Sequence, residues 1–71
     1  MSVLADNLKS LRTQQNMSQV RLSSISGVDQ ALICQLETGF NTNPKLVTLT
    51  SLAGGLNTTV SQLIGETNEA D

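Results

Sequence analysis

The residues of this sequence best suited to chemistry are glutamines in its middle, since an amide side chain carries a hydrogen-bond donor and an acceptor side by side. Gln30 and Gln35 stand in the segment DQALICQLE, together with the apolar residues Ala31 and Leu32. A glutamine amide can bond N6 and N7 of adenine together, and an apolar side chain can touch the methyl group of thymine. Because this segment contains no Arg or Lys, its residue types favour contacts with A·T pairs over contacts with guanine.

A catalytic role has little support in the composition. The chain has no histidine, one cysteine and no glycine motif that could cradle a phosphate, and its carboxylates are not paired at a useful spacing. We therefore expect no enzyme, no cofactor and no metal site. Cys34 could act as a redox sensor, but no basic neighbour in the sequence would activate its thiol, and a passive thiol is the favoured interpretation.

The distribution of charge matters more than its sum. The net charge of −2 argues against a nucleic-acid binder, whose domain is usually basic. Three of the six acidic residues, however, lie in residues 66–71, which we expect to form an acidic, flexible tail. Residues 1–65 carry four basic and three acidic residues, a balance of +1. A DNA-binding domain over residues 1–65 remains compatible with this charge, with a weak dependence of affinity on salt.

The length of 71 residues predicts one domain, close to the lower limit for a self-sufficient core. Such a core gives only about 3–5 kcal/mol of stability, so dimerisation would help. One cysteine suits a reducing cytosol, and the chain has neither a basic leader nor an apolar run of about 18 residues. We expect a cytoplasmic protein without a membrane segment. The expected core consists of Leu4, Leu8, Leu11, Leu22, Ile33, Leu36, Leu49, Leu52, Leu56 and Leu63.

Apolar residues at helical spacing, with capping residues between them, predict five helices. Ser18 and Asp29 are good N-caps for the second and third helices, and Gly27 and Gly39 can take the positive φ that ends them. Asn16 can end the first helix in the left-handed conformation. No segment alternates apolar and polar residues for long, so the expected fold class is all-α. The expected helices span about residues 2–15, 19–26, 30–37, 45–54 and a short stretch after Thr59.

Four further expectations concern the packing and the ends of the helices. Val28 should plug the elbow between the second and third helices into the core. Gly54 and Gly55 cost about 1 kcal/mol each in a helix, so the fourth helix is expected to end early. Thr59 starts a T-x-x-Q capping box for the last helix. The inward face of the fourth helix should carry Leu46, Leu49, Leu52 and Ala53.

Residues 18–39 follow the pattern SQxxLSxxSGVDxxxIxxLExG, which fits two short helices joined by a tight elbow. This pattern resembles the Cro/CI-type (XRE) helix-turn-helix family, and most closely the small repressors and Cro proteins of lambdoid phages. The match covers about residues 4–65. It implies a lambda-repressor-like DNA-binding domain, a compact five-helix bundle that places its third helix in the major groove.

The resemblance also implies roles for individual residues. Gln19 matches a family glutamine that touches a phosphate and steadies the base-reading glutamine. Arg12 and Glu37 match a structural ion pair, and Arg12 could contact phosphate as well. The loop after Gly39 lacks the basic residues usual in the family and keeps only Lys45, which weakens its electrostatic pull on DNA. The expected base contacts are Gln30, Ala31, Leu32 and Gln35, and the expected phosphate contacts are Arg12, Ser18, Gln19, Thr38, Asn41, Thr42, Asn43 and Lys45.

Several of these residues have a plain alternative. Gln30 and Gln35 could be solvated helix surface, and Leu32 could belong to the margin of the core instead of touching a thymine methyl group. Phe40, the one aromatic residue, could anchor a partner, lie over the DNA backbone or pack beneath its loop.

The sequence therefore predicts a homodimeric, sequence-specific transcriptional regulator, a repressor that binds double-stranded DNA at a near-palindromic operator. Its expected location is the cytoplasm of a bacterial cell or phage-infected host, in association with the nucleoid. One alternative is an antitoxin or controller component that binds DNA and also holds a protein partner. Another is a protein-interaction module with weak or no DNA binding.

Overall fold

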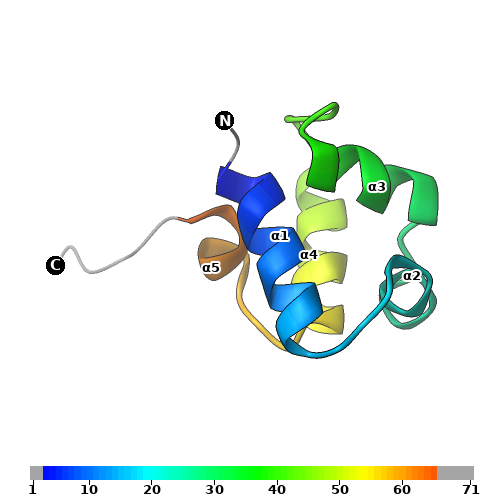
Figure 1. Ribbon diagram of the computed structural model, residues 1–71. Helices are drawn as coiled ribbons and strands as arrows, with labels where there is room; N and C mark the ends of the chain where they lie inside the picture. Colours follow the sequence, from blue (N-terminus) through cyan, green and yellow to red (C-terminus); the bar gives the residue numbers. More distant parts are fainter. Residues whose placement is uncertain (1–2, 66–71) are drawn as a thin grey trace, which may run out of the picture.

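The computed structural model describes residues 3–65, which form five α-helices and, within that range, no strand (Figure 1). The all-α prediction is confirmed, and the predicted helix ends agree to within one or two residues. The predicted acidic tail, residues 66–71, lies outside the described residues. The helices are α1 (Val3–Gln14), α2 (Gln19–Ser26), α3 (Gln30–Thr38), α4 (Leu46–Gly55) and α5 (Val60–Ile64).

The elbow between α2 and α3 forms for local reasons. The hydroxyl of Ser18 accepts a hydrogen bond from the backbone N–H of Arg21 at 3.0 Å and so caps α2. Gly27 ends α2 with a φ of 76°, in the left-handed region that glycine favours. Val28 then turns into the core and is 8% exposed, as expected. Asp29 is the N-cap residue of α3, as predicted, but its side chain makes no capping hydrogen bond.

The glycine pair in α4 does not end that helix early, contrary to the prediction, because α4 continues to Gly55. The reason is a close approach of α4 to α2. A Cβ atom on Gly55 would lie 3.0 Å from Cβ of Ser26 and 3.3 Å from Cδ1 of Leu22. Gly54 has nothing within 4 Å of the same position. The absence of a side chain at Gly55 thus lets two helices pack together, which compensates for its low helix propensity.

Leu46 in α4 and Gln62 in α5 also depart from the expected pattern. Leu46 was expected to face inward but is 69% exposed, because it begins α4, six residues before the buried Leu52. At α5, Thr59 accepts a hydrogen bond from the N–H of Gln62, as a capping box requires. The side chain of Gln62 does not complete the box, since it accepts from the hydroxyl of Thr58 instead.

The core joins all five helices. α1 packs against α3 and α5, α2 packs against α3 and α4, and α4 packs against α5. Leu11 and Leu49, both expected in the core, are only half-buried at its margin. None of the helices within residues 3–65 has the length and apolar character needed to span a membrane. The buried apolar residues are Leu4, Ala5, Leu8, Leu22, Val28, Ile33, Leu36, Leu52, Ala53, Leu56 and Leu63.

Candidate nucleic-acid interface

The outward face of α3 carries the predicted base-reading side chains. Its inward face is fixed, because Ile33 and Leu36 are fully buried. Gln30, Ala31 and Gln35 are exposed, whereas Leu32 is half-buried against the core. Three of the four candidates therefore lie on an accessible surface, and Leu32 lies at the boundary between that surface and the core.

The candidates are also placed at a favourable end of the helix. α3 begins at Gln30, so Gln30 and Ala31 belong to its first turn. The backbone N–H groups of a first turn have no partner within the helix, and they carry the positive end of its dipole. A nucleic acid that approached this end would meet hydrogen-bond donors from the backbone and amide groups from the side chains.

An ion pair fixes α3 against α1 from the other end. Nε of Arg12 donates to Oε2 of Glu37 at 2.6 Å, and Nη2 donates to Oε1 at 2.9 Å. The third guanidinium nitrogen, Nη1, donates to the backbone carbonyl of Met17 at 2.6 Å. The side chains of Arg12 and Glu37 are only 11% and 4% exposed. Two parallel hydrogen bonds between charged groups give this contact a defined direction as well as strength.

The titration of the pair follows from its surroundings. Burial alone would raise the pKa of Glu37, but hydrogen bonds from Arg12 and Gln19 and the positive charges of Arg12 and Lys9 hold this pKa below its usual value. The hydrogen bond to Glu37 raises the pKa of Arg12, against the opposite effect of burial. Both side chains are therefore charged near neutral pH.

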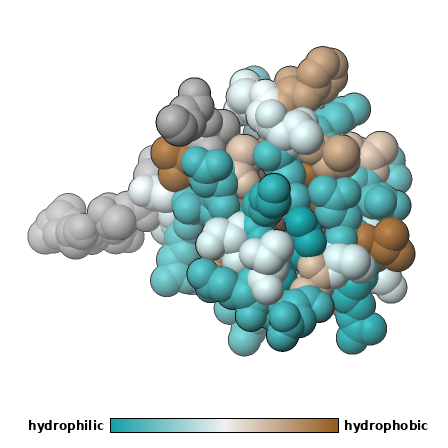
Figure 2. All heavy atoms as spheres, viewed as in Figure 1, coloured by the Kyte–Doolittle hydropathy of each residue, from teal (hydrophilic) through white to brown (hydrophobic). Residues whose placement is uncertain are grey.

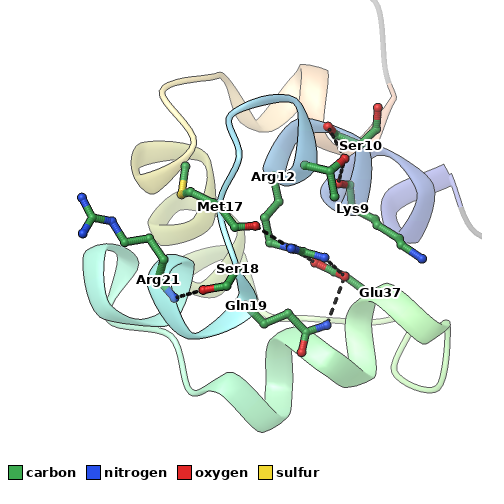
Figure 3. A network of polar contacts seen from close by, with 9 residues as sticks. Lys9, Ser10, Arg12, Met17, Ser18, Gln19, Arg21 and Glu37 are labelled. Carbon is green, nitrogen blue, oxygen red and sulfur yellow. Dashed lines mark hydrogen bonds and ion pairs between the residues drawn. The ribbon is translucent and has the colours of Figure 1, made fainter.

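Gln19 connects this pair to α2. Its Nε2 donates to Oε1 of Glu37 at 3.1 Å (Figure 3). In Figure 3 the carbonyl oxygen of Gln19 points away from the carboxylate. We call Arg12, Gln19 and Glu37 the polar junction, because these three side chains tie α1, α2 and α3 together.

A family model described as "Helix-turn-helix" matches residues 8–63. The chain belongs to the helix-turn-helix family. The predicted resemblance to the Cro/CI-type (XRE) group of this family is confirmed.

Two relatives illustrate the match. The chain is 42% identical over 66 residues to an uncharacterized HTH-type transcriptional regulator of Coxiella burnetii (strain RSA 493 / Nine Mile phase I). The aligned residues make up 93% of this chain and 31% of that protein. The chain is 40% identical over 62 residues to Control protein C.SmaI of Serratia marcescens. The aligned residues make up 87% of this chain and 73% of that protein. The chain thus spans less than a third of the length of the first relative.

The phosphate contacts predicted for a helix-turn-helix protein fall into two groups along the chain. Ser18 and Gln19 stand at the start of α2, and Ser18 is exposed while its hydroxyl caps the helix. The second group begins at Thr38, the last residue of α3, whose hydroxyl donates to the carbonyl of Gln35 at 3.2 Å, and continues in the loop after the helix. Thr38, Thr42, Asn43 and Lys45 are exposed, and Asn41 is half-buried.

The loop after α3 has an ordered turn. The backbone N–H of Asn41 donates to the carbonyl of Gln35 at 3.1 Å, and Oδ1 of Asn41 accepts from the N–H of Asn43 at 3.0 Å. Arg12 differs from the other phosphate candidates, since all three of its guanidinium nitrogens are engaged inside the protein. Its contact with phosphate stays a prediction, and the geometry favours its structural role.

No role was predicted for two basic residues, Lys9 on α1 and Arg21 near the start of α2. The positive charge of Lys9 acts on Glu37. Lys9 precedes Arg12 by one turn of α1, and this spacing could have identified it as a neighbour of the ion pair. Arg21 is exposed and projects from α2 (Figure 3). It lines a shallow depression of about 570 Å³ together with Gln15, Asn16, Met17, Ser18 and Ile25.

Three of the six exposed large apolar side chains within residues 3–65 lie in or just after the loop that follows α3. Phe40 is 81% exposed, so the interpretation that it packs beneath the loop was wrong. Leu46 and Val47 are 69% and 68% exposed. Most of the face drawn in Figure 2 is hydrophilic, and its hydrophobic areas are small and separated. Phe40, Leu46 and Val47 are therefore candidates for contact with a partner or with DNA.

Proposed function

We propose that this protein is a DNA-binding transcriptional regulator that reads sequence through α3 in the major groove. The observation that carries the proposal is the division of α3 into two faces. Ile33 and Leu36 anchor one face in the core, and Gln30, Ala31 and Gln35 stand exposed on the other. Membership of the helix-turn-helix family supports this assignment, as does the printed name of the Coxiella burnetii relative.

The finer proposal is a repressor that acts as a homodimer. Two copies would dock through the region around α4 and α5 and place their recognition helices roughly 34 Å apart on a near-palindromic operator. Leu46 and Val47 support this proposal, since they leave apolar surface exposed on α4. Repression would follow because a bound dimer blocks the access of RNA polymerase to its promoter.

The test begins with selection of bound sequences from random double-stranded DNA, followed by fluorescence-anisotropy titrations at a fixed salt concentration. Gln30→Ala should weaken binding to the selected duplex by about 5- to 150-fold, the range for loss of one bidentate base contact. It should leave binding to unrelated DNA nearly unchanged.

Gln14→Ala is a matched control for this substitution. Gln14 is also exposed, and within residues 3–65 its side chain donates only to the hydroxyl of Ser10 on the same helix. An equal loss on selected and unrelated DNA for Gln30→Ala would contradict base reading. The absence of any binding at low salt, with the fold confirmed by circular dichroism, would favour a protein-interaction module.

A controller or antitoxin component is a second candidate, in which the same domain binds DNA and also holds a protein partner. The match to Control protein C.SmaI favours it, because this chain covers 73% of that protein. Co-purification from the native host separates the two proposals. A stoichiometric protein partner would support the controller, and recovery of the chain alone in its DNA-bound form would support the simple repressor.

A further inference from the structure

Few positive charges are available in this chain to attract the DNA backbone. The basic residues are Lys9, Arg12, Arg21 and Lys45. The guanidinium group of Arg12 is largely buried and is bonded to Glu37 and to a backbone carbonyl. A DNA-binding protein draws its non-specific affinity from cations that neutralise phosphates. In this chain that attraction must come mainly from Lys9, Arg21 and Lys45.

The ammonium group of Lys9 is available to a ligand. Lys9 is exposed on α1, and within residues 3–65 its side chain takes part in no ion pair or hydrogen bond. The carboxylates nearest to it along the fold are those of Asp6, one turn earlier on α1, and of Glu37. Neither forms an ion pair with Lys9. Glu37 is already bonded through both oxygens to Arg12, so its charge does not depend on Lys9 for compensation.

Lys9 stands beside the end of α3. In Figure 3 its side chain extends from α1 toward α3 near Glu37, and its positive charge acts on that carboxylate. Glu37 is the last residue but one of α3, and the second group of predicted phosphate contacts begins at the next residue, Thr38. Lys45 is the only basic residue of that group. Lys9 thus brings a positive charge from α1 to a side of the molecule where the loop after α3 has few.

Arg21 has the same charge but lies elsewhere. Gln19 faces α3 through its bond to Glu37, and Arg21 follows it by two residues, which is about 200° around an α-helix. Arg21 therefore projects from the side of α2 that faces away from α3, where it lines the depression next to Met17. Lys9 and Arg21 lie on opposite sides of the polar junction in Figure 3. The two residues offer a comparison in which the charge is the same and the position differs.

We infer that Lys9 is a phosphate-binding residue, which holds the DNA backbone from α1 beside the loop after α3. This inference rests on the proposed function and adds a contact that neither the residue pattern nor the family resemblance predicted. A lysine suits the role, because its ammonium group is a point charge on a flexible chain and binds phosphate without a fixed geometry. Such a contact positions the protein on the duplex but reads no base.

Lys9→Gln tests the inference, because glutamine keeps a long polar side chain and removes the charge. Fluorescence-anisotropy titrations at several salt concentrations give the association constant on the selected duplex and on an unrelated duplex. Arg21→Gln is the matched control, with the same change of net charge, and Lys9→Arg keeps the charge at the site. The titrations are repeated on selected duplexes in which one phosphate at a time is replaced by the uncharged methylphosphonate. Thermal unfolding checks that each variant is folded.

Lys9→Gln should weaken binding to both duplexes by the same factor, since a phosphate contact carries no sequence information. The slope of the logarithm of the association constant against the logarithm of salt concentration should fall in magnitude by about 0.9. The loss relative to wild type should therefore shrink about 3- to 4-fold between about 50 and 200 mM salt. Arg21→Gln should keep the wild-type slope, and Lys9→Arg should keep it too. On one methylphosphonate duplex the loss should vanish, which identifies the phosphate.

A wild-type slope for Lys9→Gln would overturn the inference even if the affinity falls, because a purely structural role changes affinity without changing the number of counterions released. Equal changes of slope for Lys9→Gln and Arg21→Gln would overturn it as well, since they would show a general effect of net charge. Both results leave the proposed function standing. Equal affinity of the wild type for every duplex, with a smaller slope for Lys9→Gln, would instead defeat sequence reading and keep the contact of Lys9. The absence of binding to any duplex would defeat both.

Discussion

Two regions hold α2 in place by different physical means. The polar junction of Arg12, Gln19 and Glu37 uses directional hydrogen bonds between charged and amide groups. Towards the other end of α2, Gly55 allows α4 to approach Ser26 and Leu22 by shape alone. The hydrogen bonds of the polar junction depend on the charge of Glu37, and they orient the amide of Gln19. The packing of α4 against α2 depends only on side-chain volume, so substitutions should change the two regions independently.

The largest expected effect is at the polar junction. Glu37→Ala should lower the free energy of unfolding by about 2–4 kcal/mol, because it leaves the guanidinium of Arg12 largely buried without its partner. Urea denaturation with linear extrapolation measures this loss. Asp6→Ala is the control, since Asp6 is exposed on the same α1, and it should change stability by less than about 0.5 kcal/mol. Equal effects of both substitutions would mean that the ion pair adds nothing in solution.

Gly55→Ala should be next in size. The added Cβ atom would stand 3.0 Å from Cβ of Ser26, so α2 and α4 must separate, at about 1–3 kcal/mol of stability. Gly54→Ala is the matched control, because nothing lies within 4 Å of its Cβ position. It should stabilise the protein by about 0.5–1 kcal/mol through helix propensity. Effects of the same sign at both positions would argue against the close approach of the two helices.

The two regions should also differ in their response to pH. The pKa of Glu37 is lowered in the folded protein, so its contribution to stability is fully present above the usual carboxyl pKa of about 4.3. That contribution falls as the pH drops through the lowered folded pKa. The difference in unfolding free energy between wild type and Glu37→Gln should therefore shrink in acid. The difference between wild type and Gly55→Ala should stay constant, and a parallel decline of both would contradict the assignment.

The smallest effects concern the caps of the two helices of the motif. Ser18→Ala should cost about 1 kcal/mol, since it removes the hydrogen bond to the N–H of Arg21. Asp29→Ala should cost a few tenths of a kcal/mol, because the side chain of Asp29 makes no such bond. Thermal unfolding of the two variants compares them directly. A larger loss for Asp29→Ala would show that this residue caps α3 in solution.

Much of the fold could be predicted because it depends on local sequence. Ser18 and Gly27 act within one turn of the residues that they cap, and the helical spacing of Leu8, Ile33 and Leu36 marks faces that are buried. The fold class, the helix ends and most of the core follow from such patterns. The ion pair between Arg12 and Glu37 followed from the family resemblance and not from spacing.

The remaining features depend on distances between helices, which a single sequence does not contain. Gly55 reads as a helix breaker until the approach of α2 is known. Leu46 fits the inward pattern of α4 but stands beyond the end of the core. The bond from Gln19 to Glu37 joins residues of two helices, and only the packing of α2 against α3 brings them together. The sequence predicted a role for Gln19 but could not show that its amide bonds Glu37.

The central claim is that the exposed face of α3 reads DNA, and a ¹⁵N NMR titration with the selected duplex tests it most directly. The largest changes should fall on the side-chain amides of Gln30 and Gln35 and on the backbone signals of the first turn of α3. Smaller changes are expected in the loop that follows α3. Changes confined to α4 and α5, with the signals of Gln30 and Gln35 unaffected, would contradict the account.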